Sequence, residues 1–412
     1  TLARSRTIAP FALRAASLTE TVPAPLPPDA PWIVLKFGGT SVASVERWRT
    51  ILDLAAARRA EGARVVVVVS ALAGVTDALK ALCACAPKDR AAALQALREK
   101  HRALVAQMQL GPAEAMERWL ASLCTAATAA QAGHSWQALV QAHGELLTSS
   151  LGAAFMSANG LRTEWLDARE ALLAREVPFA NERSRALSAQ VDAQHDPAFA
   201  AALAQRGEVF ITQGFIARDA KGDTVLLGRG GSDTSAAYFG ALLRAARVEI
   251  WTDVAGMFSA DPRQVPGARL LQRLDYEEAQ EIATTGAKVL HPRCLSPCRR
   301  ARVPLLIKDT QRPQLDGTVI GPQLPEEAPS IKAISSRRGI TLVSMETVGM
   351  WQQVGFLADV FALVKQHGLS VDLIGSAETN VTVSLDPTEN LLDSDAVAAL
   401  AADLEKICRV KV

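Results

Sequence analysis

The pattern of apolar and polar residues predicts that a parallel β-sheet begins soon after residue 30. Trp32–Phe37 is a strand-sized apolar run that stops at two glycines, and Val65–Val69 is a second run without polar alternation. A run without alternation is typical of a strand buried on both faces. Between the two runs, from Val45 to Arg58, apolar residues recur at helical spacing and most charged residues fall opposite them. A strand, a helix and another strand form a βαβ unit, which indicates a mostly parallel sheet.

The centre of the chain predicts a helical block and then further strands. Residues 78–158 are rich in Ala, Leu, Gln and Arg, with one internal break at Gly111-Pro112. The stretch from residue 209 to 320 has α/β character. Its strand-like runs are Val209–Thr212, Val225–Leu227, Val248–Thr252 and Pro304–Ile307.

The last eighty residues follow a different order of elements. Prolines at 322, 325 and 329 predict a hinge just before these last eighty residues. Beyond the hinge the order is strand, helix, strand, strand, helix, strand, which fits a small α+β module. We expect strands at Ile340–Met345, Ser370–Ile374, Val381–Leu385 and Arg409–Val412, and helices at Gly355–His367 and Ala396–Ile407.

Composition narrows the class of protein. The chain has 412 residues, 49% of them hydrophobic and 21% charged, which is typical of a globular protein with two or three domains. The net charge of +1 gives no reason to expect nucleic acid or a membrane surface as a partner. The longest apolar runs are far too short to span a bilayer.

The six cysteines do not form the pattern of a disulfide framework, so we expect a reducing compartment. A zinc site at His291, Cys294 and Cys298 would need a second cysteine pair at the usual spacing, and the chain has none. We therefore expect free thiols on a helix and no metal held by the protein alone.

Residues 1–30 differ from the rest of the chain. This segment has Arg4, Arg6 and Arg14 before its first acidic residue, Glu20, and ends in a proline-rich stretch. We interpret it as a disordered tail and linker and expect a cytoplasmic protein. The alternative is the remnant of a transit peptide, which would indicate a plastid.

Two glycine-rich loops carry the candidate chemistry. One is Lys36–Ser41, with the sequence KFGGTS, and the other is Gly228–Asp233, with the sequence GRGGSD. Glycine lets the backbone approach an oxyanion closely, and the N–H groups at a helix start act as donors. Ligands of open parallel sheets bind at the carboxyl ends of the strands, so two such loops predict a phosphate site there.

The sequences of these two loops resemble those of the aspartokinases, and four further motifs follow in the order in which that family has them. The resemblance extends over residues 31–412. The further motifs are Ser70–Thr76 (SALAGVT), His143–Glu145 (HGE), Trp251–Arg263 (WTDVAGMFSADPR) and Gly286–Pro292 (GAKVLHP). The resemblance implies the α/β fold of the amino-acid kinases, an αβα sandwich with a mostly parallel sheet, over residues 31–322. It also implies an α+β regulatory region of the ACT type over residues 331–412. This region has one ACT-like unit where the family has two, so we expect a truncated chain or part of a longer, multifunctional one.

The resemblance assigns roles on the substrate side. Lys36 resembles the lysine that stabilises the transferring phosphoryl group, and Arg229 the arginine that grips the substrate α-carboxylate. Asp233 and Glu145 resemble the acidic residues that face the substrate ammonium. An N-cap role for Asp233 is the alternative. Three hydroxyls complete the predicted substrate site, namely Thr76, Ser70 and Ser41, and those of Thr76 and Ser41 are expected near the substrate or the phosphate.

On the nucleotide side, the resemblance implies contacts to ATP from the first glycine loop and from the segment after residue 251. These residues are Gly38, Gly39, Thr252, Asp253, Phe258, Arg263 and Lys288. Phe258 has an ordinary core position as its alternative. The acceptor would be the aspartate β-carboxylate, which is ionised near neutrality, so no general base is needed. Charge stabilisation by Lys36, the loop amides and Mg²⁺ would then dominate catalysis.

The C-terminal module resembles the effector-binding part of lysine-sensitive aspartokinases. The implied effector residues are Met350, Gly355, Phe356, Leu357, Asp372, Ser376 and Glu378. The alternative is that the apolar face of Gly355–His367 packs on a small sheet. Two departures weaken the preference for lysine, because Ala377 stands where the family has serine and Gln353 where it often has a hydroxyl.

The sequence leaves open the oligomeric state and two alternative functions. We expect a homodimer, formed through the ACT modules. A sister kinase acting on glutamate or acetylglutamate would keep the fold, although the GRGGSD and HGE motifs argue against it. A non-catalytic amino-acid sensor is the third candidate, and the intact Lys36, Arg229, Asp233 and Asp253 argue against it.

Overall fold

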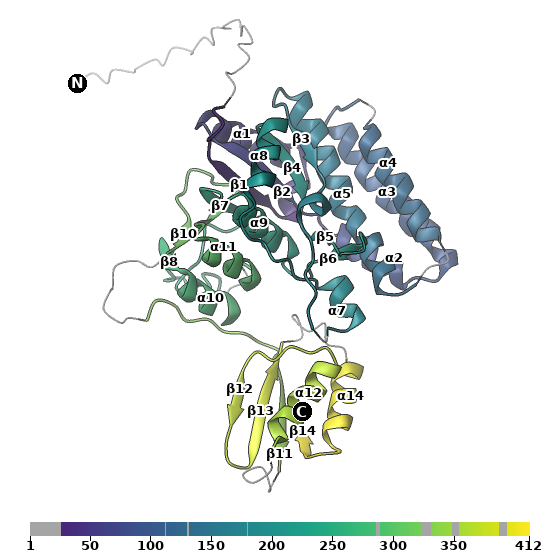
Figure 1. Ribbon diagram of the computed structural model, residues 1–412, viewed down its shortest axis with the longest axis vertical. Helices are drawn as coiled ribbons and strands as arrows, with labels where there is room; N and C mark the ends of the chain where they lie inside the picture. The colour runs from purple at the N-terminus through teal and green to yellow at the C-terminus, as the bar shows by residue number, and fades with distance from the viewer. Residues whose placement is uncertain are drawn as a thin grey trace, which may run out of the picture.

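The computed structural model describes residues 26–111, 113–129, 132–178, 180–285, 289–322, 331–347, 354–386 and 394–412. Figure 1 shows a large α/β body that contains strands β1 to β10 and a smaller module at the C-terminal end. The predicted tail up to residue 25 and most of the predicted hinge, residues 323–330, lie outside the described residues.

An eight-stranded sheet forms the centre of the large body. Its order is β3-β4-β2-β1-β7-β9-β10-β8, and all neighbours run parallel except β9 and β10. The predicted mostly parallel sheet is therefore confirmed. The strands are β1 (Trp32–Phe37), β2 (Arg64–Val69), β3 (Glu164–Leu166), β4 (Val209–Gln213), β7 (Arg247–Thr252), β8 (Arg273–Asp275), β9 (Leu305–Asp309) and β10 (Thr318–Gly321).

Side-chain alternation along the strands creates two hydrophobic layers. Val34 and Val66 enter one cluster, whereas their neighbours Ile33 and Val65 enter the other. Helix α9 covers the first layer, and helices α1 and α2 cover the second, as the predicted αβα sandwich requires. The helices of the large body are α1 (Val45–Ala60), α2 (Val75–Ala84), α3 (Arg90–Gln107), α4 (Glu114–Thr128), α5 (His134–Ala158), α6 (Ala168–Ala171), α7 (Glu182–Leu187), α8 (Pro197–Arg206), α9 (Gly231–Leu242), α10 (Tyr276–Thr285) and α11 (Leu295–Ala301), with 3₁₀ turns η1 (Gly39–Val42), η2 (Pro87–Asp89) and η3 (Pro292–Cys294).

Helix α5 differs from the other helices because it is buried on several faces. Its residues Ala142 and Leu146 belong to one hydrophobic cluster, and Leu147 and Leu151 belong to the other. A helix that is apolar nearly all round lies inside the protein. This position brings the polar residues of the HGE motif into the interior.

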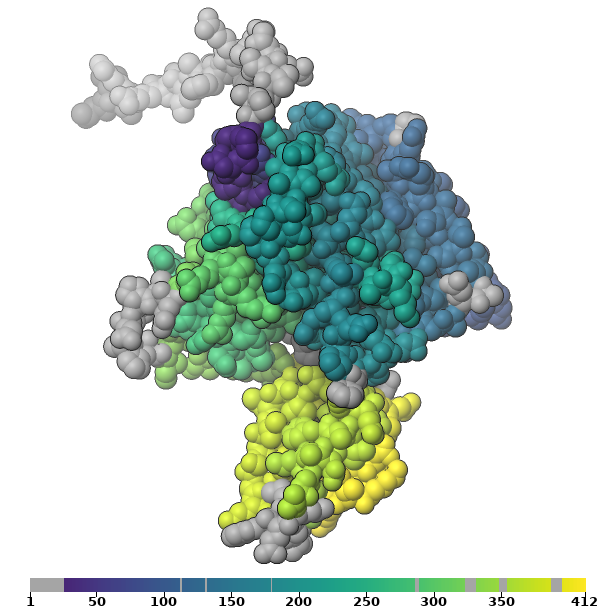
Figure 2. All heavy atoms as spheres, in the orientation of Figure 1, coloured from purple at the N-terminus to yellow at the C-terminus, as the bar shows by residue number. Residues whose placement is uncertain are grey.

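The C-terminal module is a four-stranded antiparallel sheet, in the order β12-β13-β11-β14, with two helices. It has its own hydrophobic cluster, and Figure 2 shows it as a distinct body at one end of the molecule. The predicted order of strands and helices is confirmed, but the strand expected at Ser370–Ile374 begins only at its last residue. The elements are β11 (Thr341–Glu346), α12 (Phe356–Gln366), β12 (Ile374–Ser376), β13 (Asn380–Leu385), α14 (Ser394–Leu404) and β14 (Arg409–Lys411).

All six cysteines are free thiols, and Cys294 and Cys298 are buried. Within the described ranges, no three His, Cys, Asp or Glu side chains come together in a way that would hold a metal ion. In the parts of the chain that the structure covers, none of the helices combines the length and the apolar character that a bilayer crossing requires.

Candidate active site

The first glycine loop leaves the carboxyl end of β1, in the middle of the parallel sheet. It lies against the segment that follows β2, since Ala73 N donates to Gly39 O at 3.2 Å. A Cβ atom at residue 39 would lie 2.8 Å from Ala71 O, so the close approach of the two segments requires glycine there. The motif KFGGTS thus packs its backbone directly on the motif SALAGVT.

The second glycine loop does not follow a strand of the large sheet, which corrects the prediction. It follows β6 (Thr224–Leu226), which pairs only with β5 (Ile216–Arg218) in a separate two-stranded sheet. Three-residue strands have too few side chains to distinguish a hairpin from a sheet strand in the sequence. The loop still opens a long helix, α9, as the loop motif predicts.

The backbone of the second loop depends on glycine and on the segment around His291. Gly228 and Gly230 have φ angles of +74° and +64°. A Cβ atom at residue 230 would lie 2.1 Å from His291 Cγ. Arg293 Nη1 donates to Leu227 O at 2.9 Å, so the segment that contains His291 and Arg293 supports the loop.

An ion pair joins the two loops. Lys36 Nζ lies 2.6 Å from Asp233 Oδ1, and both side chains are 12% exposed. Asp233 Oδ2 accepts a hydrogen bond from His291 N at 3.3 Å. The N-cap of α9 is Gly230, and Asp233 stands in the first turn, so the alternative N-cap role for Asp233 is wrong. Two motifs almost two hundred residues apart thus meet at one charged centre.

The segment that follows β2 also forms hydrogen bonds to residues around this ion pair. Ser70 Oγ donates to Ser232 Oγ at 2.9 Å. Glu145, carried inward by α5, accepts a hydrogen bond from Ala71 N at 3.1 Å. Burial raises the pKa of Glu145 to about 8, because a low-dielectric surrounding disfavours the charged carboxylate. Thr76 is half-buried in the first turn of α2.

Arg229 is exposed within the second loop, between the two glycines of positive φ. Its position, four residues before Asp233, keeps it in the same loop as the ion pair. An exposed guanidinium beside a buried ion pair suits the capture of an anion from solvent.

The carboxyl ends of β7 and β9 form the predicted nucleotide side. Thr310 Oγ1 donates to Thr252 O at 2.5 Å and lies 3.4 Å from Ser41 Oγ. Ser41 therefore contacts the predicted nucleotide side. Asp253 and Arg263 are exposed on the loop that follows.

Two further nucleotide residues differ in how the structure places them. Phe258 is half-buried and forms an isolated β-bridge with Leu270. This position fits its packing alternative as well as a contact to the nucleotide. Lys288 lies outside the described residues.

The predicted effector residues are divided between core and surface. Phe356 is 2% exposed and belongs to the core of the module, as the packing alternative expects, whereas Leu357 is 47% exposed. Gly355 precedes α12 with a φ of +91°. Asp372 N donates to Ser384 O at 3.0 Å. Ser376 and Glu378 are exposed on and just after β12, and Met350 lies outside the described residues.

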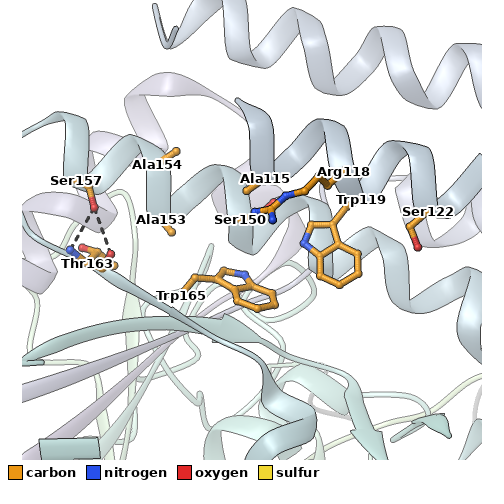
Figure 3. Close-up of a pocket in the computed structure, with 10 residues that line it drawn as sticks. All are labelled: Ala115, Arg118, Trp119, Ser122, Ser150, Ala153, Ala154, Ser157, Thr163 and Trp165. Carbon is orange, nitrogen blue, oxygen red and sulfur yellow. Dashed lines mark hydrogen bonds between the residues drawn. The ribbon is translucent and has the colours of Figure 1, made fainter. Parts of the chain in front are cut away.

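A pocket of about 610 Å³ lies away from this centre, between α4, α5 and β3 (Figure 3). Trp119 and Trp165 face it, with ring centroids 5.9 Å apart, and Arg118 stands at its edge. None of the predicted site residues lines this pocket. His143, of the HGE motif, packs edge-on against Trp119, and burial lowers its pKa to about 4, so it is neutral near pH 7.

Three residues at the charged centre were missed by the sequence analysis, namely Ser232, Arg293 and Thr310. Ser232 was inside a recognised motif, and its contact to Ser70 gives it a place in the site. Arg293 and Thr310 have no local signal, because their partners are 66 and 58 residues away in the sequence.

Comparison with known proteins agrees with this geometry. The sequence model of the amino acid kinase family matches residues 31–309. Lysine-sensitive aspartokinase 3 of Escherichia coli (strain K12) is 35% identical over 92% of this chain and 84% of its own length. The crystal structure of E. coli aspartokinase III with aspartate and ADP, in the R-state, covers 92% of this chain and 84% of its own, at 34% identity and a TM-score of 0.79. The T-state structure with lysine and aspartate has the same coverage and identity, and a TM-score of 0.74. The chain therefore belongs to the amino acid kinase family and, within it, to the aspartokinases.

Proposed function

We propose that this chain transfers the γ-phosphoryl group of ATP to the β-carboxylate of L-aspartate and so forms 4-phospho-L-aspartate. As an aspartokinase it is a phosphotransferase with a carboxyl group as acceptor. The observation that carries the proposal is the ion pair between Lys36 and Asp233, because it brings two anion-binding loops to one point. The reaction would be the first step towards lysine, threonine and methionine.

The reaction needs two anions to approach each other. A carboxylate oxygen of aspartate attacks the γ-phosphorus, the bond from the γ-phosphorus to the bridging oxygen breaks, and ADP leaves with the electron pair. The acceptor is already ionised, so no proton has to be removed. Lys36 is the residue proposed to neutralise the charge that develops on the phosphoryl oxygens, together with the N–H groups of Gly38 and Gly39.

The substrate is held by groups of complementary charge in this proposal. Arg229 would bind the α-carboxylate with two parallel hydrogen bonds, which a planar guanidinium allows. Asp233 and Glu145 would face the α-ammonium, whose positive charge lowers the pKa of a nearby carboxyl. The hydroxyls of Ser70 and Thr76 would complete this side.

The nucleotide would lie over the ends of β7 and β9, against Thr252, Asp253, Phe258 and Arg263, with Ser41 beneath it. ATP is expected to carry Mg²⁺, which usually binds through substrate phosphates and one or two carboxylates. The described site fits that mode, since the exposed carboxylate of Asp253 lies on the proposed nucleotide side. When bound, Mg²⁺ neutralises phosphate charge.

The C-terminal module is proposed to regulate the kinase by binding an amino acid, with lysine favoured. The exposed Ser376 and Glu378 and the segment at Asp372 would form the effector site, next to the glycine turn that starts α12. The E. coli relative has a T-state structure with lysine. Ala377 and Gln353 depart from the family pattern, so both the preferred amino acid and the strength of its inhibition have to be measured.

The test is formation of an acyl hydroxamate from ATP, Mg²⁺ and hydroxylamine, with L-aspartate, L-glutamate or N-acetyl-L-glutamate as acceptor. Product with aspartate alone is the expected result. Product with one of the other acceptors would replace the proposal by a sister kinase, and no product with any of them would favour a sensor. Addition of lysine or threonine to the same assay tests the regulatory part.

A further inference from the structure

The segment of residues 331–340 lies between the large body, here called the catalytic body, and the C-terminal module. It forms hydrogen bonds to the catalytic body at several points. Ile334 N donates to Ser259 O at 2.8 Å, in the loop that carries Phe258 and Arg263. Ser335 Oγ lies 2.5 Å from Thr285 Oγ1, at the end of α10. The segment is therefore in contact with the nucleotide loop and with the last turn of α10 at the same time.

Arg337 in this segment bridges the two bodies. Its Nη2 atom donates to Thr284 O in α10 at 2.5 Å, and its Nη1 atom forms an ion pair with Asp386 in the C-terminal module. The Arg337 side chain is 23% exposed and that of Asp386 only 4%. The ion pair thus links Arg337 to a carboxylate that is almost buried in the C-terminal module. The guanidinium fork lets one side chain hold both acceptors.

On the module side, Asp386 directly follows β13, the strand that holds the predicted effector segment. Ser384, two residues earlier, accepts from Asp372 N and donates its own N–H to Leu373 O at 2.9 Å. A shift of the segment at 372–373 would therefore pull on the end of β13.

On the catalytic side, α10 packs next to the segment that supports the second glycine loop. Ala279, Ile282 and Ala283 anchor α10 in the hydrophobic core of the large body. Seven residues after Thr284, His291 N contacts Asp233, which is the partner of Lys36. Helix α10 also packs against the turn η3, which begins directly after His291, so Thr284 and the charged centre are linked through packed elements.

We infer that Arg337 is a positioning residue that couples the C-terminal module to the active site, through Asp386 on one side and the end of α10 on the other. This inference rests on the proposed function, because the ligands that move the charged centre are taken to be aspartate and the nucleotide. Coupling of this kind is reciprocal, so binding at the active site must also change the module.

Hydrogen exchange of the full chain, with and without aspartate and ADP, tests the coupling without any effector. In the wild type we expect protection at residues 36–41 and 228–233, and a change of about fivefold or more in exchange at residues 372–386. In Arg337→Ala the protection of the two loops should remain while the change at 372–386 is lost. Asp386→Asn, which keeps the side-chain shape, should behave alike, and the double variant should show no further loss.

Lys411→Ala is the matched control, since it removes an ion pair, with Glu346 at 2.5 Å, that lies entirely within the module. It should keep the change at 372–386. An unaltered change in Arg337→Ala and Asp386→Asn, or loss of the change in the Lys411→Ala control as well, would overturn the inference. Loop protection without any change at 372–386 in the wild type overturns it too, while leaving the proposed function intact. Absence of loop protection overturns both.

Discussion

Lys36 and Asp233 hold opposite charges 2.6 Å apart with little access to water, and ATP would bring several more negative charges to the same place. We therefore expect Lys36→Ala to lower kcat by about a hundredfold or more, the size of effect known for removal of one charge-stabilising donor. The hydroxamate assay measures this, and thermal unfolding followed by circular dichroism checks that the fold survives. An active Lys36→Ala enzyme would remove the basis of the proposed mechanism.

We expect Glu145 to make the aspartate step dependent on pH. Burial raises its pKa to about 8, so in the free enzyme the carboxyl is mostly neutral at pH 7 and becomes a partner for the substrate ammonium as the pH rises. We expect kcat/KM for aspartate to rise with pH through about 8 and to level off above it. Glu145→Gln should lose this rise and, at pH 8, about tenfold to a hundredfold in kcat/KM, the range of one charge-assisted hydrogen bond. A Glu145→Gln enzyme with the wild-type pH profile would exclude this role.

The same residue affects stability in the opposite sense. The folded pKa lies above the ordinary value of 4.5, so the native state holds a proton that the unfolded state releases. The contribution of Glu145 to stability is therefore present below about pH 4.5 and is lost as the pH rises towards 8. The difference in melting temperature between pH 5 and pH 8 should be smaller in Glu145→Gln than in the wild type, and an equal difference would contradict the raised pKa.

At the scale of elements, the second glycine loop offers a test of how backbone shape supports the site. Gly230→Ala places a methyl group 2.1 Å from His291 Cγ at a φ of +64°, so the loop and the segment that supports it have to separate. We expect a fall in kcat/KM of about a hundredfold and a destabilisation above the ~1 kcal/mol that positive φ alone costs alanine. Gly222→Ala is the control, because residue 222 has a φ of +89° with nothing within 4 Å of the added atom. Equal effects in the two variants would show that the contact with His291 is unimportant.

Elements with a strong local pattern could be predicted closely from the sequence. The apolar run of β1 ends at Phe37 in both prediction and structure, because buried strands carry a continuous signal that two glycines interrupt. The hairpin of β5 and β6 and the late start of β12 were missed. Their strands have three residues each, and pairing partners for so short a strand are decided by packing that the local sequence does not record.

The candidate site shows the same division between local and distant signals. The loop motifs indicated Lys36 and Asp233 separately, and only the fold puts their side chains in contact. Arg293 and Thr310 are recognised solely by hydrogen bonds to distant segments. Ser41, predicted near the substrate or the phosphate, lies in the 3₁₀ turn after the first loop and contacts Thr310, just beyond the end of β9.

At the scale of the whole molecule, the C-terminal module leaves two adjacent large apolar side chains in contact with solvent, at the start of an edge strand. Leu373 and Ile374 are 69% and 58% exposed, and β12 is an edge strand of its sheet. An exposed apolar edge strand is a template for pairing with another chain. This edge is the surface through which we expect the homodimer to form.

Ile374→Lys should disrupt such a dimer, because a charged side chain at the centre of an apolar interface has to be desolvated. We expect the dimer dissociation constant, measured by sedimentation velocity over a concentration series, to rise by about a hundredfold or more. Val265→Lys is the control, since Val265 is also exposed, at 46%, but belongs to the catalytic body. The contacts of Lys36 with Asp233 and of Ser70 with Ser232 form within one chain, so we expect monomeric Ile374→Lys to keep its activity without effector. A wild-type protein that stays monomeric at all concentrations, or an Ile374→Lys variant as dimeric as the Val265→Lys control, would place the interface elsewhere or exclude it.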